Sequence, residues 1–216
     1  MQAQKREQKR AIKLAGSVKL VSELFEYSVN SILYQRGIYP PEDFKFVKKY
    51  GLTLLTTSDE RLEAYIAKVM GQVQTWILAG NISRLVMAII SKESRETIER
   101  WQFDINVEDV PKPGEKENAA PAKPAKPEKT NAEIQKDIQD TIRQIVSSVT
   151  FLPVVEEKCV FNILVYTDLD TKVPTEWIDS DPHMISGNAE QVKLRSFSTN
   201  IHTVEALVAY RLGDAL

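Results

Sequence analysis

Apolar residues recur at helical spacing in three separate segments of the chain. In residues 17–36 they cover so broad a face that only a narrow polar stripe remains, which is typical of a helix packed between other elements. Gly37 suits the left-handed residue that follows a helix, and Pro40 and Pro41 prevent the helix from continuing. We therefore predict a buried first helix that ends at Arg36.

Two further helices are indicated by capping-box spacings, in which two side chains satisfy the first backbone N–H groups of a helix. Thr57 and Glu60 show this spacing before an apolar stripe that ends at Gly80. Thr130 and Glu133 show the same spacing before another apolar stripe. The sequence thus predicts a second helix from Thr57 to Gly80 and a third helix that begins at Thr130.

Most of the remaining segments alternate between apolar and polar residues, as half-buried strands do. Strands are predicted at residues 44–56, with a break near Gly51, and at residues 82–91, 97–107, 158–167, 191–198 and 201–210. This order of elements predicts an α+β domain, with three helices on one face of a mixed or mainly antiparallel sheet.

Composition changes abruptly between Val110 and Lys129, where five of the ten prolines stand among lysines, glutamates and alanines. Such a segment cannot bury enough apolar area to offset the entropy lost on ordering, so we predict a disordered insertion at residues 108–130. Residues 1–15 are predicted to form a basic N-terminal arm. Residues 16–216 are expected to be a single domain, which the insertion interrupts without dividing.

Charge and hydropathy exclude two classes of protein. The chain has 28 basic and 30 acidic side chains, whereas a protein that coats nucleic acid is clearly basic. The longest uninterrupted apolar run, from Leu85 to Ile90, is far shorter than the ~20 residues that a membrane span needs. We therefore expect neither nucleic acid nor a membrane among the partners.

Candidate catalytic chemistry is sparse. Cys159, His202 and Asp168 could form the nucleophilic trio of a small hydrolase, but Cys159 lies in an alternating strand, where free cysteine is usually a small buried hydrophobe. His183 and His202 have no third ligand for a metal ion, and no glycine-rich phosphate loop opens a helix. We expect no catalytic residue, metal or cofactor, which leaves protein recognition as the function.

A free sheet edge would provide such recognition. If the C-terminal strands left residues 159–167, the exposed backbone groups could accept an extended peptide by β-augmentation. Trp76, Trp101 and Trp177 could anchor this rearrangement, and core packing is the alternative interpretation of each.

Several blocks of residues, in order over almost the whole chain, resemble one known family. They are NSILYQRGIYP at residues 30–40, KYGLTLL at 49–55, ERWQFD at 99–104, TFLP at 150–153, RSFST at 195–199, IH at 201–202 and VAY at 208–210. They are similar to the mitotic arrest-deficient spindle-checkpoint proteins of the HORMA fold. The basic arm and the insertion depart from the family pattern without touching a block, and both are compatible with a fungal member.

The resemblance implies a HORMA domain whose C-terminal region, from about residue 168 to 216, is a mobile safety belt with two arrangements. In the closed arrangement the belt wraps an extended ligand segment and pairs elsewhere on the sheet. In the open arrangement its strands cover the ligand edge. One sequence can hold both packings only if their free energies differ by a few kcal/mol.

Three groups of residues would carry the implied function. The ligand-peptide edge and belt would comprise Trp76, Phe161, Ile163, Val165, Tyr166, His202 and Tyr210. Dimerisation of an open with a closed copy would use Arg143, Gln144 and Phe151. The conformational switch would involve Leu14.

The implied function is that of a non-enzymatic spindle assembly checkpoint effector. It would capture a motif of basic and aliphatic residues and so inhibit the anaphase-promoting complex, a ubiquitin ligase. The implied partners are a kinetochore coiled-coil checkpoint receptor, the mitotic activator of the anaphase-promoting complex, a checkpoint kinase-like subunit of the inhibitory complex, a second copy of the chain, and an AAA+ remodelling ATPase with its HORMA-fold adaptor. The implied locations are the nucleus, the nuclear envelope, kinetochores and the cytoplasm.

Two alternatives stay open at this point. One is the HORMA accessory subunit of a translesion DNA polymerase, and the other, from a different class, is a small hydrolase that uses Cys159. The tripeptide Lys116-Glu117-Asn118 in the insertion resembles a degron read by activators of the anaphase-promoting complex. Its role and the role of the insertion are not determined by the sequence.

Overall fold

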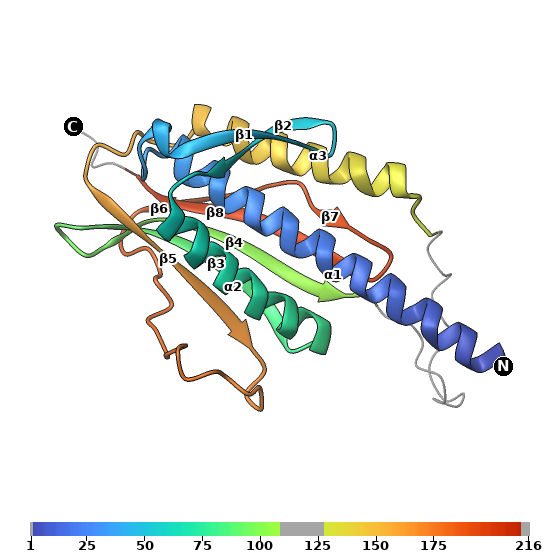
Figure 1. Ribbon diagram of the computed structural model, residues 1–216. Coiled ribbons are helices and arrows are strands. Elements are labelled where there is room, and N and C mark those ends of the chain that lie inside the picture. Colours follow the sequence, from blue (N-terminus) through green and yellow to red (C-terminus); the bar gives the residue numbers. More distant parts are fainter. Residues whose placement is uncertain (1, 109–127, 213–216) are drawn as a thin grey trace.

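The computed structural model of the protein describes residues 2–108 and 128–212 (Figure 1). The predicted insertion, with Lys116-Glu117-Asn118, lies almost wholly outside the described residues. The helices are α1 (Gln2–Gln35), α2 (Glu60–Ala79) and α3 (Asn131–Ser147), with short 3-10 turns η1 (Pro41–Asp43) and η2 (Ser148–Thr150). The strands are β1 (Phe44–Lys49), β2 (Leu52–Thr57), β3 (Ile82–Ser91), β4 (Thr97–Val107), β5 (Cys159–Thr167), β6 (Ala189–Lys193), β7 (Phe197–Ser198) and β8 (His202–Arg211).

An antiparallel sheet in the order β5-β3-β4-β8-β6, with β7 also paired to β8, forms the main layer of the domain. The three α-helices lie together on one face of this sheet (Figure 1). The predicted strand at residues 44–56 is a separate hairpin, β1-β2, which turns at Gly51 with a positive φ of 68°. The predicted α+β architecture is therefore confirmed.

The central helix, α1, contacts both α2 and α3. Its apolar face is buried against the sheet, and the Phe25 ring meets the Phe103 ring edge to face, with centroids 5.3 Å apart. The helix begins at Gln2, so most of the predicted basic arm belongs to it. The reason is that residues 2–15 are mainly Gln, Lys, Arg and Ala, which are good helix formers, with no glycine or proline among them.

The start of α2 differs from the sequence prediction. The N-cap is Asp59, whose carboxylate accepts a hydrogen bond from the backbone N–H of Leu62 at 2.7 Å. Thr57 is instead the last residue of β2, and its hydroxyl bonds to neighbouring backbone groups. Thr and Asp can both cap a helix, so the Thr57 prediction was wrong because a better-placed cap stood two residues later. The Thr130–Glu133 capping box of α3 is present as predicted.

A buried ion pair joins the end of α1 to the sheet. The Arg36 and Glu99 side chains are only 4% and 2% exposed, and the Arg36 Nε–H donates to Glu99 at 2.7 Å. Arg36 also donates to the carbonyl of Pro153, and the indole N–H of Trp101 donates to Glu99 at 3.1 Å. Burial raises the pKa of Glu99, although Arg36 and Trp101 oppose the shift. Trp101 is thus a core residue, 1% exposed.

The C-terminal strands occupy the β4 edge of the sheet. β8 pairs with β4 from His202 to Tyr210, and β6 pairs with the far side of β8. The predicted strand at residues 191–198 is split into β6 and β7, because the backbone N–H of Arg195 donates to the side chain of Gln144 on α3 at 2.5 Å. This strand order corresponds to the closed arrangement that the resemblance implies.

Candidate peptide-binding channel

The outer edge of β5 has no strand beside it in the described part of the chain. β5 pairs with β3 from Cys159 opposite Ser91 to Thr167 opposite Ile82, and β8 lies on the other side of β4. Every second residue of an unpaired edge directs its N–H and C=O groups away from the sheet. The backbone of Ile163 donates a hydrogen bond to the Tyr65 hydroxyl, so the outward-facing set includes Ile163 and, two residues away on either side, Phe161 and Val165.

Residues 168–188, which we call the crossing segment, connect β5 to β6 and pass beside this edge. The segment begins where the backbone N–H of Asp168 donates to the carbonyl of Asn81 at 3.0 Å, and it ends where the Asn188 carbonyl accepts from Leu212 at 3.0 Å. A cavity of about 710 Å³ lies between the crossing segment, β5 and α2. We call this cavity the channel; it is lined by residues 65, 68, 69, 162–166 and 176–182.

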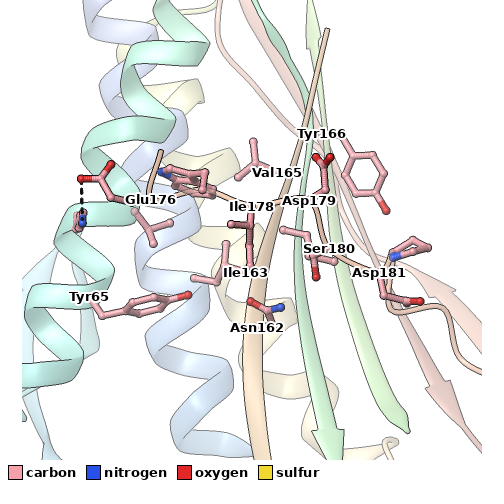
Figure 2. A pocket seen from close by; sticks show the side chains of 15 residues that line it. Tyr65, Asn162, Ile163, Val165, Tyr166, Glu176, Ile178, Asp179, Ser180 and Asp181 are labelled. Carbon is pink, nitrogen blue, oxygen red and sulfur yellow. Dashed lines mark ion pairs between the residues drawn. The ribbon is translucent and has the colours of Figure 1, made fainter. Parts of the chain in front are cut away.

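On the helix side, the crossing segment is fastened to α2. The indole N–H of Trp76 donates to the carbonyl of Lys172 at 3.4 Å. The Trp76 ring meets the Trp177 ring at a centroid distance of 5.0 Å and an angle of 70°. An ion pair between Lys68 and Glu176 at 3.6 Å adds a third, solvent-exposed contact (Figure 2).

On the opposite face of the sheet, the crossing segment is fastened by residues that the sequence did not reveal. The Arg100 Nε–H donates to the carbonyl of Pro182 at 3.3 Å. The Asn162 amide lies 3.3 Å from the His183 imidazole. His183 has a positive φ of 49°, and its backbone N–H donates to Asp181 at 2.7 Å. In the sequence, Arg100 and Asn162 are polar residues of alternating strands, and His183 is a loop histidine. Such residues are typical of a solvent-exposed surface, so the sequence did not indicate that they hold the crossing segment.

The two sides of β5 offer different chemistry to a bound segment. Figure 2 shows Ile163 and Val165 on the side of Tyr65 and Tyr166 on the other side. Burial raises the pKa of Tyr65, and the hydrogen bond from Ile163 opposes the shift. The crossing segment adds three carboxylates, those of Glu176, Asp179 and Asp181, to the channel wall. A segment in the channel would therefore meet an apolar wall and an acidic rim.

Five of the predicted ligand-edge residues lie in or beside the channel. Ile163, Val165 and Tyr166 line it, Phe161 packs between the rings of Tyr39 and Tyr65, and Trp76 holds the crossing segment.

His202 and Tyr210 lie elsewhere, on β8, which β3 and β4 separate from β5. His202 is buried, and its Nδ1 lies 2.6 Å from the Ser17 hydroxyl of α1. Tyr210 donates to Glu190 of β6 at 2.7 Å. Both belong to the predicted belt, and both act where β8 docks rather than in the channel.

The residues predicted for dimerisation form a separate surface at the end of α3. Arg143 is exposed and lies 3.3 Å from Asp140, and Phe151 is 44% exposed. Gln144 accepts the backbone hydrogen bond from Arg195 described above. Leu14, predicted as the conformational switch, is half-buried in α1 and packs against the core.

The side chains proposed for a hydrolase do not come together. Cys159 begins β5 and Asp168 directly follows its last residue, about 30 Å away at the usual rise of a strand, and His202 is on β8. Burial raises the pKa of the Cys159 thiol, which disfavours the nucleophilic thiolate. In residues 2–108 and 128–212, no group of three or more His, Cys, Asp or Glu could hold a metal ion. Among the same residues, no helix is long and apolar enough to cross a membrane.

Comparison with known proteins agrees with this architecture. The HORMA domain model matches residues 17–202. The mitotic spindle checkpoint component mad2 of Schizosaccharomyces pombe is 52% identical over 204 residues, which cover 93% of this chain and 94% of that protein. The mitotic spindle assembly checkpoint protein MAD2A of Homo sapiens is 46% identical over 201 residues, or 93% of each chain.

Two solved structures extend the comparison. A chain in the crystal structure of a mitotic checkpoint complex has a TM-score of 0.78 and 49% identity, over 91% of this chain and 99% of that one. C. elegans HTP-1 bound to the HIM-3 closure motif has a TM-score of 0.69 at 12% identity, over 91% and 90% of the two chains, and shares the fold. The predicted spindle-checkpoint identity is confirmed, and the translesion-polymerase alternative has less support. The chain belongs to the HORMA domain family, and within that family to the MAD2 spindle checkpoint proteins.

Proposed function

We propose that this protein is a spindle assembly checkpoint effector that captures an extended segment of a partner in the channel and so inhibits the anaphase-promoting complex. The observation that carries the proposal is the unpaired edge of β5, which faces a cavity of about 710 Å³ beneath the crossing segment. The bound segment pairs with the outward groups of Phe161, Ile163 and Val165 through backbone hydrogen bonds. Side-chain pockets then select the sequence.

The channel has the dimensions and charge for a short strand. Five consecutive residues of β5, 162–166, line it, and at about 3.3 Å per residue they span roughly 16 Å. The carboxylates of Glu176, Asp179 and Asp181 favour a basic side chain at its rim. Tyr65, Ile163 and Trp177 favour aliphatic side chains within it. This chemistry supports the basic-aliphatic motif that the resemblance implies.

The proposed donors of this motif are a kinetochore coiled-coil checkpoint receptor and the mitotic activator of the anaphase-promoting complex. The further proposed partners are a checkpoint kinase-like subunit of the inhibitory complex and an AAA+ remodelling ATPase with its HORMA-fold adaptor. The solved mitotic checkpoint complex, which contains a chain similar to this one, supports assembly with checkpoint partners. The proposed locations are the nucleus, its envelope, kinetochores and the cytoplasm.

A second copy of the chain is also a proposed partner. An open copy would dock on a closed one through Arg143, Gln144 and Phe151. The exposure of Arg143 and Phe151 at one end of α3 supports this proposal, since neither side chain is needed for the core.

The test is the capture of a fluorescein-labelled peptide with a basic-aliphatic core, followed by fluorescence anisotropy during association and release. We expect slow association and much slower release, because the belt must leave the sheet before the segment can enter or leave. Deleting residues 207–216 removes part of β8 and should abolish the slow release. Fast binding that does not depend on this deletion would reduce the mechanism to simple strand addition, and no binding by the full chain would contradict the proposal.

A further inference from the structure

A buried arginine lies beneath the belt, on the sheet face opposite the helices. Arg100 is in β4, and only 5% of it is exposed. Its neighbours in register are Ala88 on β3 and Ala209 on β8. The small alanine side chains leave room for the long arginine side chain to lie along the surface of the sheet. No carboxylate among the described residues forms an ion pair with Arg100.

The Arg100 guanidinium uses its donors on neutral acceptors that belong to three different segments. Its Nε–H donates to the Pro182 carbonyl of the crossing segment at 3.3 Å. One Nη donates to the Tyr166 hydroxyl of β5 at 3.2 Å, and the other donates to the side chain of Gln102 on β4 at 2.5 Å. One side chain therefore links the crossing segment to the strand that borders the channel.

A second contact with the crossing segment comes from a residue that is in line with Arg100 across the strands of the sheet. Asn162 of β5 is in register with Ala88, which is in register with Arg100. Asn162 contacts His183, the residue directly after the Pro182 that Arg100 holds. Pro182 and His183, which are consecutive in the crossing segment, thus contact Arg100 and Asn162, respectively. Ala88 lies between Arg100 and Asn162 in the sheet.

We propose that Arg100 is a positioning residue that fastens the belt on the outer face of the sheet and so sets how long a captured segment stays in the channel. The inference rests on the proposed function. Trp76 and Trp177 hold the crossing segment on the helix side of β5, and Arg100 holds it on the other side. A segment enclosed between the two attachments is released only when the crossing segment moves away. A charged donor to a carbonyl makes a stronger hydrogen bond than a neutral donor.

The test compares Arg100→Met with Arg84→Met. Arg84 is on the same face, its guanidinium lies 5.5 Å from the Tyr166 ring, and it pairs with Asp104, but no hydrogen bond joins it to the crossing segment. The control therefore removes a guanidinium beside Tyr166 without unfastening the belt. We expect Arg100→Met to release the fluorescein-labelled peptide at least roughly tenfold faster, the effect of one lost hydrogen bond to a charged donor, and Arg84→Met to leave release unchanged.

A second readout needs no peptide. Lys172 is the only trypsin site in residues 168–188, so cleavage after Lys172, followed by mass spectrometry, reports opening of the crossing segment. Arg100→Met should speed this cleavage while the thermal unfolding midpoint stays near that of the unmodified protein. Equal cleavage and release rates in the two variants would overturn the inference. If the unmodified protein binds no peptide, the proposed function fails, and the cleavage assay still decides whether Arg100 fastens the belt.

Discussion

Trp177→Ala should loosen the belt more than any other single change in the crossing segment. The Trp177 ring is half-buried against Trp76 of α2. A fully buried tryptophan hides at most about 250 Å², so half of that area, at roughly 25 cal/mol per Å², contributes about 3 kcal/mol. The edge-to-face ring pair adds about 0.5–1.5 kcal/mol, and ordering the side chain subtracts about 1 kcal/mol.

The net loss of about 3 kcal/mol lowers the free energy of opening the belt, because the contact between Trp177 and Trp76 joins the crossing segment to α2. Since about 1.4 kcal/mol changes an equilibrium constant tenfold, the fraction of open belt should rise roughly a hundredfold. Trypsin cleavage after Lys172 should accelerate by a similar factor, provided that closing is faster than cleavage. Peptide release should accelerate as well.

Leu169→Ala is the matched control for this change. Leu169 is in the same segment but fully exposed, with a relative exposure of 104%, so its truncation removes no packed area. Its cleavage rate should equal that of the unmodified protein. If Trp177→Ala accelerates cleavage no more than Leu169→Ala does, the ring pair does not fasten the belt, and the assignment of Trp76 and Trp177 as its helix-side attachment is wrong.

Three other changes test separate parts of the structure. Arg36→Met leaves Glu99 buried without its ion-pair partner and should lower the free energy of unfolding by about 3–5 kcal/mol; urea titration should show that adding Glu99→Gln restores most of the loss. Burial lowers the pKa of His202, so its contribution to stability is present above the unfolded pKa of about 6.5 and is lost as the pH falls through the lower folded pKa. The free energy of unfolding should therefore decline as the pH falls from about 6.5 toward the lower folded pKa, and His202→Gln should flatten the decline in urea titrations from pH 5 to 8. Arg143→Glu reverses a charge on the proposed dimer surface and should abolish self-association in analytical ultracentrifugation while peptide capture persists, and an unchanged dimer would contradict the assignment.

The secondary structure was predictable because a helix or strand with one buried face repeats its apolar residues at the spacing of that helix or strand. The alternating residues of β4 place Glu99, Trp101 and Phe103 against the helices and leave Arg100 on the other face. The same regularity explains the error at α2, since Thr57 and Asp59 are both acceptable caps and only the end of β2 decides between them.

The fastenings of the belt could not be read from the sequence alone. Arg100 shares its face of β4 with Gln102 and Asp104, and such a run of polar positions normally faces solvent. Arg100 is buried because residues 182 and 183, far along the chain, cross over it. The sequence also does not indicate which edge of the sheet β8 joins. An alternating strand such as β8 fits either edge, and only contacts with side chains of the neighbouring layer distinguish the two edges. Here the Ser17–His202 contact ties β8 to α1.

The two attachments together explain how a loop with few contacts could give slow release. They lie on opposite sides of β5 and share no residue, so their contributions should add. About 3 kcal/mol from the Trp76–Trp177 pair and about 1.5–3 kcal/mol from the Arg100 hydrogen bond give roughly 5 kcal/mol, or more than a thousandfold in the opening equilibrium. None of this free energy depends on the sequence of the bound segment. The channel therefore selects the partner, whereas the belt sets the lifetime, and the same slow release would apply to each partner that offers a fitting strand.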